Sequence, residues 1–142
     1  QSSFDVITLW HVLEHIHNLD EVIRRFHNLL NEKGILVISV PNVDALDRGI
    51  YKEYWSAYDV PRHLYHFNKK TISILMNRLG FQLESTYPMI FDSYYISVYS
   101  EWHMNSGKIR AVLKAIKNGF FSNWSARKTG NYSSLIYIFR KQ

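Results

Sequence analysis

The sequence of 142 residues contains no cysteine, so it can form neither a disulfide framework nor a thiolate metal site. It also lacks any apolar run approaching the roughly 20 residues that a membrane-spanning helix needs. The first residues, QSSFDVITLW, have neither the basic start nor the small-residue cleavage site of a signal peptide. We therefore expect a cytoplasmic protein.

The composition is that of a globular domain, with 46% hydrophobic, 20% charged and 15% aromatic residues. The charge is uneven along the chain. Residues 1–100 hold nine Lys and Arg against eleven Asp and Glu, whereas residues 101–142 hold eight against one. The basic C-terminal part indicates either an anionic partner, such as phosphate, nucleic acid or a lipid surface, or a solvated helix face. No nucleic-acid-binding motif accompanies it.

Hydrophobic periodicity predicts alternating strands and helices within one α/β domain. We predict strands at Phe4–Trp10, Gly34–Asn42, Phe81–Met89 and Ser133–Lys141, and helices at 19–30, 68–80 and 108–121. The first strand has almost no polar alternation, which predicts burial on both faces. Gly34 is expected to end the first helix.

Two segments do not fit this alternation. Residues 43–67 form a long, irregular stretch dense in Tyr, Trp and His, which is typical of a functional loop. Residues 92–106 are ambiguous, and together with the helix that follows they form an insert before the last strand.

Five segments resemble, in order and spacing, the C-terminal half of class I S-adenosylmethionine-dependent methyltransferases, and most closely the bacterial ubiquinone-type O-methyltransferases. The segments are FDVITLWHVLEHI, LLNEKGILVISVPN, DVPRHLYHF, MNRLGF and SSLIYIFRK. The resemblance implies a partial Rossmann-like sheet, made of the fourth to seventh strands of a seven-stranded sheet, with flanking helices and a helical insert. The last strand is expected to be antiparallel.

The resemblance also implies that residues 1–142 are the C-terminal portion of a single methyltransferase domain, with the cofactor-loop portion absent. In the family that loop is a glycine-rich turn after the first strand. The sequence has six glycines, and no two of them form G-x-G. At about 30 residues per βαβ unit, roughly 60–100 residues would be missing.

The cofactor and base assignments centre on the end of the first strand, because ligands of open α/β sheets bind beyond the carboxyl ends of the strands. The resemblance implies that Leu9, Trp10 and His11 border the methionine end of S-adenosylmethionine. Methyl transfer to a hydroxyl needs a base, and the pKa of histidine suits that role. We expect His15 or His63 to be this base.

The acceptor is expected to be a small molecule or glycan that is methylated on oxygen. We expect Arg62 to anchor an anionic acceptor, with Asp59 and His66 beside it; alternatively, Asp59 and Arg62 pair to fix their loop. Tyr94 and Tyr95 would stack on a sugar or an aromatic ring.

Two other functions are open. HVLEH spells H-x-x-E-H, so a metal-dependent hydrolase could use His11, Glu14 and His15. Alternatively, the chain is a non-catalytic methyltransferase-like module kept for association with a partner. Whichever function holds, the unpaired edge of the first strand predicts a homodimer of this chain through that strand.

Overall fold

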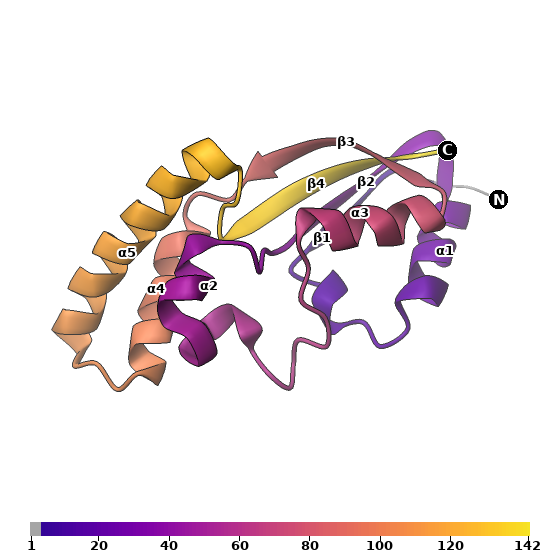
Figure 1. The fold of residues 1–142 in the computed structure, drawn as a ribbon. Coiled ribbons are helices and arrows are strands. Elements are labelled where there is room, and N and C mark those ends of the chain that lie inside the picture. Colours follow the sequence, from indigo (N-terminus) through magenta and orange to yellow (C-terminus); the bar gives the residue numbers. More distant parts are fainter. Residues whose placement is uncertain (1–3) are drawn as a thin grey trace.

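The computed structural model describes residues 4–142 and shows an α/β fold (Figure 1). The predicted class is therefore confirmed. The strands are β1 (Phe4–Trp10), β2 (Leu30–Pro41), β3 (Phe81–Pro88) and β4 (Ser134–Lys141). The helices are α1 (Leu19–Leu29), α2 (Leu46–Tyr51), α3 (Lys69–Arg78), α4 (Asp92–His103) and α5 (Lys108–Thr129).

The four strands form one sheet in the order β1-β2-β4-β3. β1 runs parallel to β2, and β4 lies between β2 and β3 antiparallel to both. The prediction of an antiparallel last strand is confirmed. It follows that β1, β2 and β3 point the same way, so their carboxyl ends share one edge of the sheet.

One face of the sheet carries the main core, because α1 and α3 pack against it. β2 contributes Leu36 and Ile38 to this core, and β4 contributes Tyr137 and Phe139. The helices supply buried side chains at helical spacing: Leu19, Ile23, Ile72, Met76 and Leu79. On the opposite face, residues such as Val37 stay partly exposed.

The expectation that the first strand is buried on both faces is wrong for this structure. Phe4, Val6 and Trp10 are each about half exposed. The reason is position: β1 is at the edge of the sheet, and among residues 4–142 it pairs only with β2.

Gly34 does not end the first helix. α1 ends at Leu29, because Leu30 already pairs with Phe4 and so begins β2. The positive φ in this region falls on Lys33, at 61°, and Gly34 lies inside the strand.

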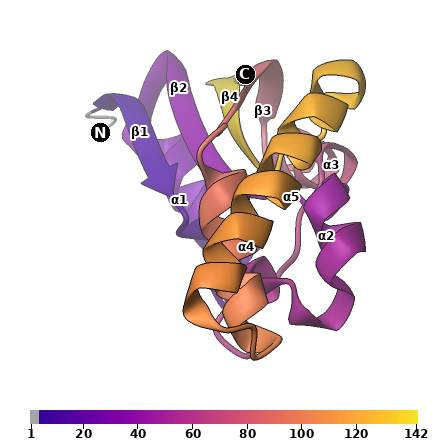
Figure 2. The same cartoon turned by 90° about the vertical axis from the view of Figure 1, so that its left-hand side faces the viewer.

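The helices α2, α4 and α5 gather at the edge of the sheet where β1, β2 and β3 end, whereas the N- and C-termini lie at the opposite edge (Figures 1 and 2). The segment 43–67, predicted to be irregular, contains α2 and two short 3₁₀ turns at Lys52–Tyr54 and Ser56–Tyr58. The ambiguous residues 92–106 contain the whole of α4, and α5 extends eight residues beyond its predicted end. The predicted helical insert is confirmed.

A buried carboxylate organises this second group of helices. Asp47 of α2 is fully buried and accepts hydrogen bonds from Trp55 Nε1 at 2.9 Å, Ser122 Oγ at 2.8 Å and Ser133 Oγ at 2.9 Å. These donors come from the segment after α2, from α5 and from the residue before β4. One side chain therefore ties three parts of the chain together beside the carboxyl edge of the sheet.

Within residues 4–142, no helix has the length and apolar character needed to cross a lipid bilayer.

Candidate active site

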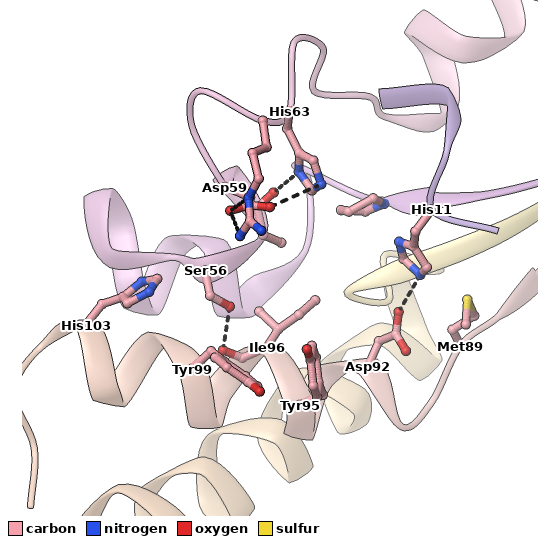
Figure 3. Close-up of a pocket in the computed structure, with 13 residues that line it drawn as sticks. His11, Ser56, Asp59, His63, Met89, Asp92, Tyr95, Ile96, Tyr99 and His103 are labelled. Atoms are coloured by element: carbon pink, nitrogen blue, oxygen red, sulfur yellow. Dashed lines mark hydrogen bonds and ion pairs between the residues drawn. The ribbon is translucent and has the colours of Figure 1, made fainter. Parts of the chain in front are cut away.

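A pocket of about 480 Å³ lies at the carboxyl edge shared by β1, β2 and β3 (Figure 3). Its walls come from the end of β1, the 3₁₀ turn and loop after α2, and α4. The lining residues that carry polar or aromatic groups are His11, Ser56, Asp59, Arg62, His63, Asp92, Tyr95, Tyr99 and His103. A volume of this size suits a small-molecule ligand.

His11 stands at the first position after β1. Its backbone N–H donates to the carbonyl of Ser39 at 3.0 Å, which continues the β1–β2 pairing, and its φ of 51° turns the chain away from the sheet. The imidazole lies between two carboxylates, with Nε2 3.2 Å from Asp92 Oδ2 and Nδ1 3.4 Å from Glu14 Oε1. The neighbouring carboxylates of Asp92 and then of Glu14 favour the protonated ring and raise the pKa of His11 to about 9. His11 is therefore a cation at neutral pH, and it links the end of β1 to the start of α4.

Glu14 is buried beneath the pocket, in the turn after β1. Neither of its carboxylate oxygens has a hydrogen-bond partner among the described residues. Two histidine nitrogens lie close to Glu14 Oε1: His11 Nδ1 at 3.4 Å and His63 Nε2 at 3.8 Å. A buried carboxylate in this position gives the site a negative charge that favours cations, including protonated histidine.

His63 is the more enclosed of the two predicted base candidates. Its side chain is 10% exposed, and Nδ1 lies 2.8 Å from the carbonyl oxygen of Ala57. Because a carbonyl only accepts, Nδ1 carries the proton and Nε2 is left as an acceptor. His15 packs edge-on against His63 with ring centroids 4.6 Å apart, but it is exposed and does not line the pocket.

Glu14, His15 and His63 each bring one ligand atom to within 4.8 Å of the others. His15 Nδ1 is 3.0 Å from the carbonyl oxygen of Arg62, so its Nε2 is free, as in His63. Two nitrogens and one oxygen could hold a divalent cation, and this donor set suits a transition metal such as Zn²⁺ better than Mg²⁺. The triad of the hydrolase alternative is not assembled, because His11 is directed to Asp92 and stands outside this group.

The loop after α2 carries the predicted acceptor residues. Arg62 donates to Asp59 Oδ1 from Nη2 at 2.6 Å and from Nε at 3.0 Å, and the backbone N–H groups of Arg62 and His63 both donate to the Asp59 carbonyl. The alternative in which Asp59 and Arg62 pair to fix the loop therefore describes the structure. His66 lies outside the pocket lining, with Nε2 3.0 Å from the carbonyl oxygen of Tyr58.

The two predicted tyrosines of α4 point different ways. Tyr95 lines the pocket and packs against Tyr99, with ring centroids 4.6 Å apart. Tyr94 instead packs against α5 at Gly119, where an added Cβ would lie 2.7 Å from the Tyr94 ring. The assignment of Tyr94 to the acceptor is therefore wrong for this structure, because successive helical residues lie about 100° apart around the axis.

Of the three predicted cofactor residues, only His11 lines the pocket. The Leu9 side chain is buried in the main core, and the Trp10 side chain is half exposed outside the pocket. Consecutive residues of a strand alternate between its two faces, so the side chains of Leu9 and Trp10 cannot converge on one ligand. Any contribution from Leu9 or Trp10 must come from the backbone.

Asp92 is a pocket residue that sequence reasoning missed, although a signal was present. The segment FDS follows β3 closely, and β3 ends at the same edge of the sheet as β1 and β2. The rule that placed His11 at the site therefore also applied to Asp92. Tyr99 was not predicted, because the sequence did not identify residues 92–106 as a helix. Only in a helix does a spacing of four residues place Tyr99 on the same face as Tyr95.

Several solved structures that resemble this chain are methyltransferases. A SAM-dependent methyltransferase from Thermotoga maritima is 11% identical with a TM-score of 0.59, and the match covers 99% of this chain and 57% of that one. Magnesium protoporphyrin IX methyltransferase from Synechocystis PCC 6803, with bound S-adenosylhomocysteine, is 14% identical with a TM-score of 0.54 and coverage of 100% and 47%. Phosphoethanolamine N-methyltransferase 2 from Haemonchus contortus is 19% identical with a TM-score of 0.52 and coverage of 98% and 33%.

These similarities define the fold class, and this chain spans only about a third to a little over half of the length of these proteins. The family model described as "Methyltransferase domain" matches residues 1–86. The chain therefore belongs to the methyltransferase domain family, whose cofactor is S-adenosylmethionine. No curated protein matches the sequence significantly.

Proposed function

We propose that residues 1–142 are the C-terminal portion of a methyltransferase domain, and that the whole protein methylates a hydroxyl group of a small-molecule or glycan acceptor. The observation that carries this proposal is the pocket at the shared carboxyl edge, with His63 in its wall. The sheet order, with β4 inserted antiparallel between β2 and β3, supports equating β1 to β4 with the fourth to seventh strands of the family.

The described residues fit one side of a cofactor site. S-adenosylmethionine supplies an electrophilic methyl group on a sulfonium sulfur. The backbone of Leu9–His11 reaches the pocket edge at His11 and would accept a hydrogen bond from the amino group of the methionine portion. Because the sequence has no G-x-G turn, the adenosine side of the cofactor would be bound by residues outside 1–142.

His63 is the base in this proposal, in preference to His15. Its Nε2 is an acceptor within the pocket wall, so it would take the proton of the acceptor hydroxyl when the methyl group passes to that oxygen and its bond to the sulfonium sulfur, which leaves as a neutral thioether, breaks. The proton then rests on Nε2, and the buried carboxylate of Glu14, 3.8 Å away, stabilises the imidazolium. The carbonyl of Ala57 holds the ring orientation throughout.

The acceptor is positioned by the aromatic wall of α4 in this proposal. Tyr95 and Tyr99 present ring faces and hydroxyl groups, which suits a sugar or an aromatic ring. Asp59 and Arg62 neutralise each other, so they shape the loop that carries His63. Catalysis then rests on orientation in line with the methyl group, assisted by one base.

The test uses the full-length protein, including any residues encoded before position 1. We expect calorimetry to detect binding of S-adenosylhomocysteine, and labelled S-adenosylmethionine to methylate at least one of a panel of phenols and glycosides. His63→Ala should lower kcat about 100-fold or more while cofactor affinity stays within a factor of two. His17→Ala, which changes an exposed histidine outside the pocket, is the matched control.

A full-length protein that binds no S-adenosylhomocysteine would refute the proposal as a whole. If binding is intact but His63→Ala is as active as His17→Ala, only the assignment of the base is wrong.

A further inference from the structure

The helix α5 packs on the rest of the molecule through small side chains. Its buried positions are Ala111, Ala115, Gly119, Ser122, Asn123 and Ala126. Apart from the adjacent pair Ser122 and Asn123, these residues recur every three or four positions, and they let α5 approach α4 closely, as the contact between Gly119 and the ring of Tyr94 shows. The larger side chains of α5 are consequently left on the other side of the helix.

The opposite face of α5 is an apolar stripe. Its members, with their exposed fractions, are Ile109 (81%), Leu113 (65%), Ile116 (55%), Phe120 (57%) and Trp124 (53%). Their spacing of four, three, four and four residues places them in one row along a helix of 22 residues. Single exposed apolar residues are ordinary, but a continuous row of five on one helix face marks an interaction surface.

A row of cations runs beside the apolar stripe. Arg110, Lys117 and Lys128 lie on the flank of the stripe at helical spacing, and α5 contains no acidic residue. Lys114 instead turns inward to Glu101, at 3.1 Å. Lys128 Nζ sits 5.5 Å above the Trp124 ring, so the apolar and cationic rows meet at the C-terminal end of the helix.

We propose that this face of α5 binds the surface of an anionic lipid bilayer. The helix lies parallel to the membrane with the stripe below the headgroups, where apolar burial drives binding. The cationic row faces the phosphates, and each basic residue near an anionic surface strengthens the attraction to it. The partner of this face must therefore offer both an apolar region and negative charges. An anionic bilayer offers both, in its acyl chains and its headgroups.

Two other occupants fit the same face less well. Nucleic acid would neutralise Arg110 and Lys117, but its phosphate-lined surface offers no burial for Ile109, Leu113 and Ile116. A symmetric pairing of two copies would bury the stripe but would place two cationic rows near each other, with no acidic residue on α5 to neutralise them. The lipid assignment does not depend on the proposed enzymatic function.

The experiment measures co-sedimentation of the full chain with two kinds of vesicle. One contains equal parts of phosphatidylcholine and phosphatidylglycerol, and the other contains phosphatidylcholine alone. We expect binding to the anionic vesicles, at least about tenfold weaker binding to the neutral ones, and weakening by high salt. Tryptophan fluorescence should shift to the blue on binding, and Trp124→Phe should remove most of that shift.

Matched variants on α5 and α3 test whether binding depends on the proposed face of α5 or only on overall charge and hydrophobicity. Leu113→Glu combined with Ile116→Glu should abolish binding, whereas Ile74→Glu, at a residue of α3 that is 59% exposed, should not. Arg110→Glu with Lys117→Glu should weaken binding about tenfold or more, whereas Lys69→Glu with Lys70→Glu on α3 should have a much smaller effect. All four positions on α5 are exposed, so folding is expected to be unaffected and is checked by circular dichroism.

Absence of binding to anionic vesicles overturns the proposal, as does binding that the double variant Leu113→Glu/Ile116→Glu leaves unchanged. Light scattering that shows a dimer dissociated by the same double variant overturns it in favour of self-association. Tighter binding of an RNA oligonucleotide than of anionic vesicles overturns it in favour of a nucleic-acid surface.

Discussion

His11 joins two elements electrostatically, because its imidazolium lies between Asp92 at the start of α4 and Glu14 after β1. The folded protein holds this proton more tightly than the unfolded chain does, since folding raises the pKa from 6.5 to about 9. The stabilisation is therefore complete below pH 6.5 and declines as the pH rises towards 9. Scanning calorimetry across this range should show Tm falling.

His11→Gln should have a lower Tm than the native protein at pH 6.5 and should lack the part of the decline due to this group. His17→Gln, at an exposed position, should keep the native profile. The ion-pair account would be contradicted if the Tm of the native protein did not change between pH 6.5 and about pH 9. It would also be contradicted if the Tm of His11→Gln fell as much as that of the native protein over this range.

At the residue scale, the sequence led to part of the pocket. His11, Asp59 and His63 could be predicted because polar residues after parallel strands converge at one edge. The direction of an individual side chain could not be predicted, because that depends on how each element is rotated against its neighbours. Tyr94 and Tyr95 illustrate this: they are adjacent in sequence, yet one lines the pocket and the other packs against Gly119.

At the element scale, α2 is held in place by Asp47. Removing this carboxylate leaves three buried donors, on Trp55, Ser122 and Ser133, without their acceptor. We expect Asp47→Ala to lower the free energy of unfolding by about 3–5 kcal/mol, measured by urea denaturation. Asp44→Ala, an exposed position just before α2, should change it by less than about 0.5 kcal/mol. Equal effects at the two positions would show that the buried network does not determine the stability of this region.

The packing of α4 on α5 can be tested with two helical glycines. Gly49 in α2 has open space around it, so Gly49→Ala should stabilise the protein by about 0.5–1 kcal/mol through helix propensity. At Gly119 the added Cβ meets the Tyr94 ring at 2.7 Å, and overpacking of about 1–3 kcal/mol should outweigh that gain. Thermal denaturation of the two variants gives the comparison. A Gly119→Ala variant as stable as Gly49→Ala would show that Tyr94 moves freely.

The elements with strong local signals were predicted well, and those that depend on distant partners were not. The helix α3 begins directly after Asn68, the first residue of its predicted range, and the Asn68 side chain caps it by accepting from the N–H of Thr71. By contrast, β2 begins four residues before its predicted start, because Leu30 pairs with Phe4 from another part of the chain. The short helix α2 was missed because Trp55, Ser122 and Ser133 fix its position through Asp47, and two of these three residues lie far along the sequence.

At the scale of the whole molecule, the pocket and the apolar stripe belong to the same hairpin of helices. α4 gives the pocket its aromatic wall, and α5, packed against α4, carries the stripe. Binding of α5 to a lipid surface would therefore fix the position of the pocket relative to that surface. The sheet supports the pocket, because His11 directly follows β1 and the helix α4, which begins at Asp92, follows β3.

The free edge of β1 leads to the last prediction. Within residues 4–142 the outer side of β1 has no strand partner, and the side chains of Phe4, Val6 and Trp10 in this strand are about half exposed. An unpaired edge of this kind favours association with another strand, and a charge on it opposes such association. We expect the chain of residues 1–142 to form a homodimer through β1. Light scattering should show a monomer for Val6→Lys, whereas Ile74→Lys, at a similarly exposed residue of α3, should remain a dimer.

In the full-length protein, the proposed preceding strands would occupy this edge. Val6→Lys should therefore lower the Tm of the full-length protein and leave its mass unchanged. A chain that stays monomeric at all concentrations, or a dimer that Val6→Lys does not dissociate, would exclude the β1 edge as the interface.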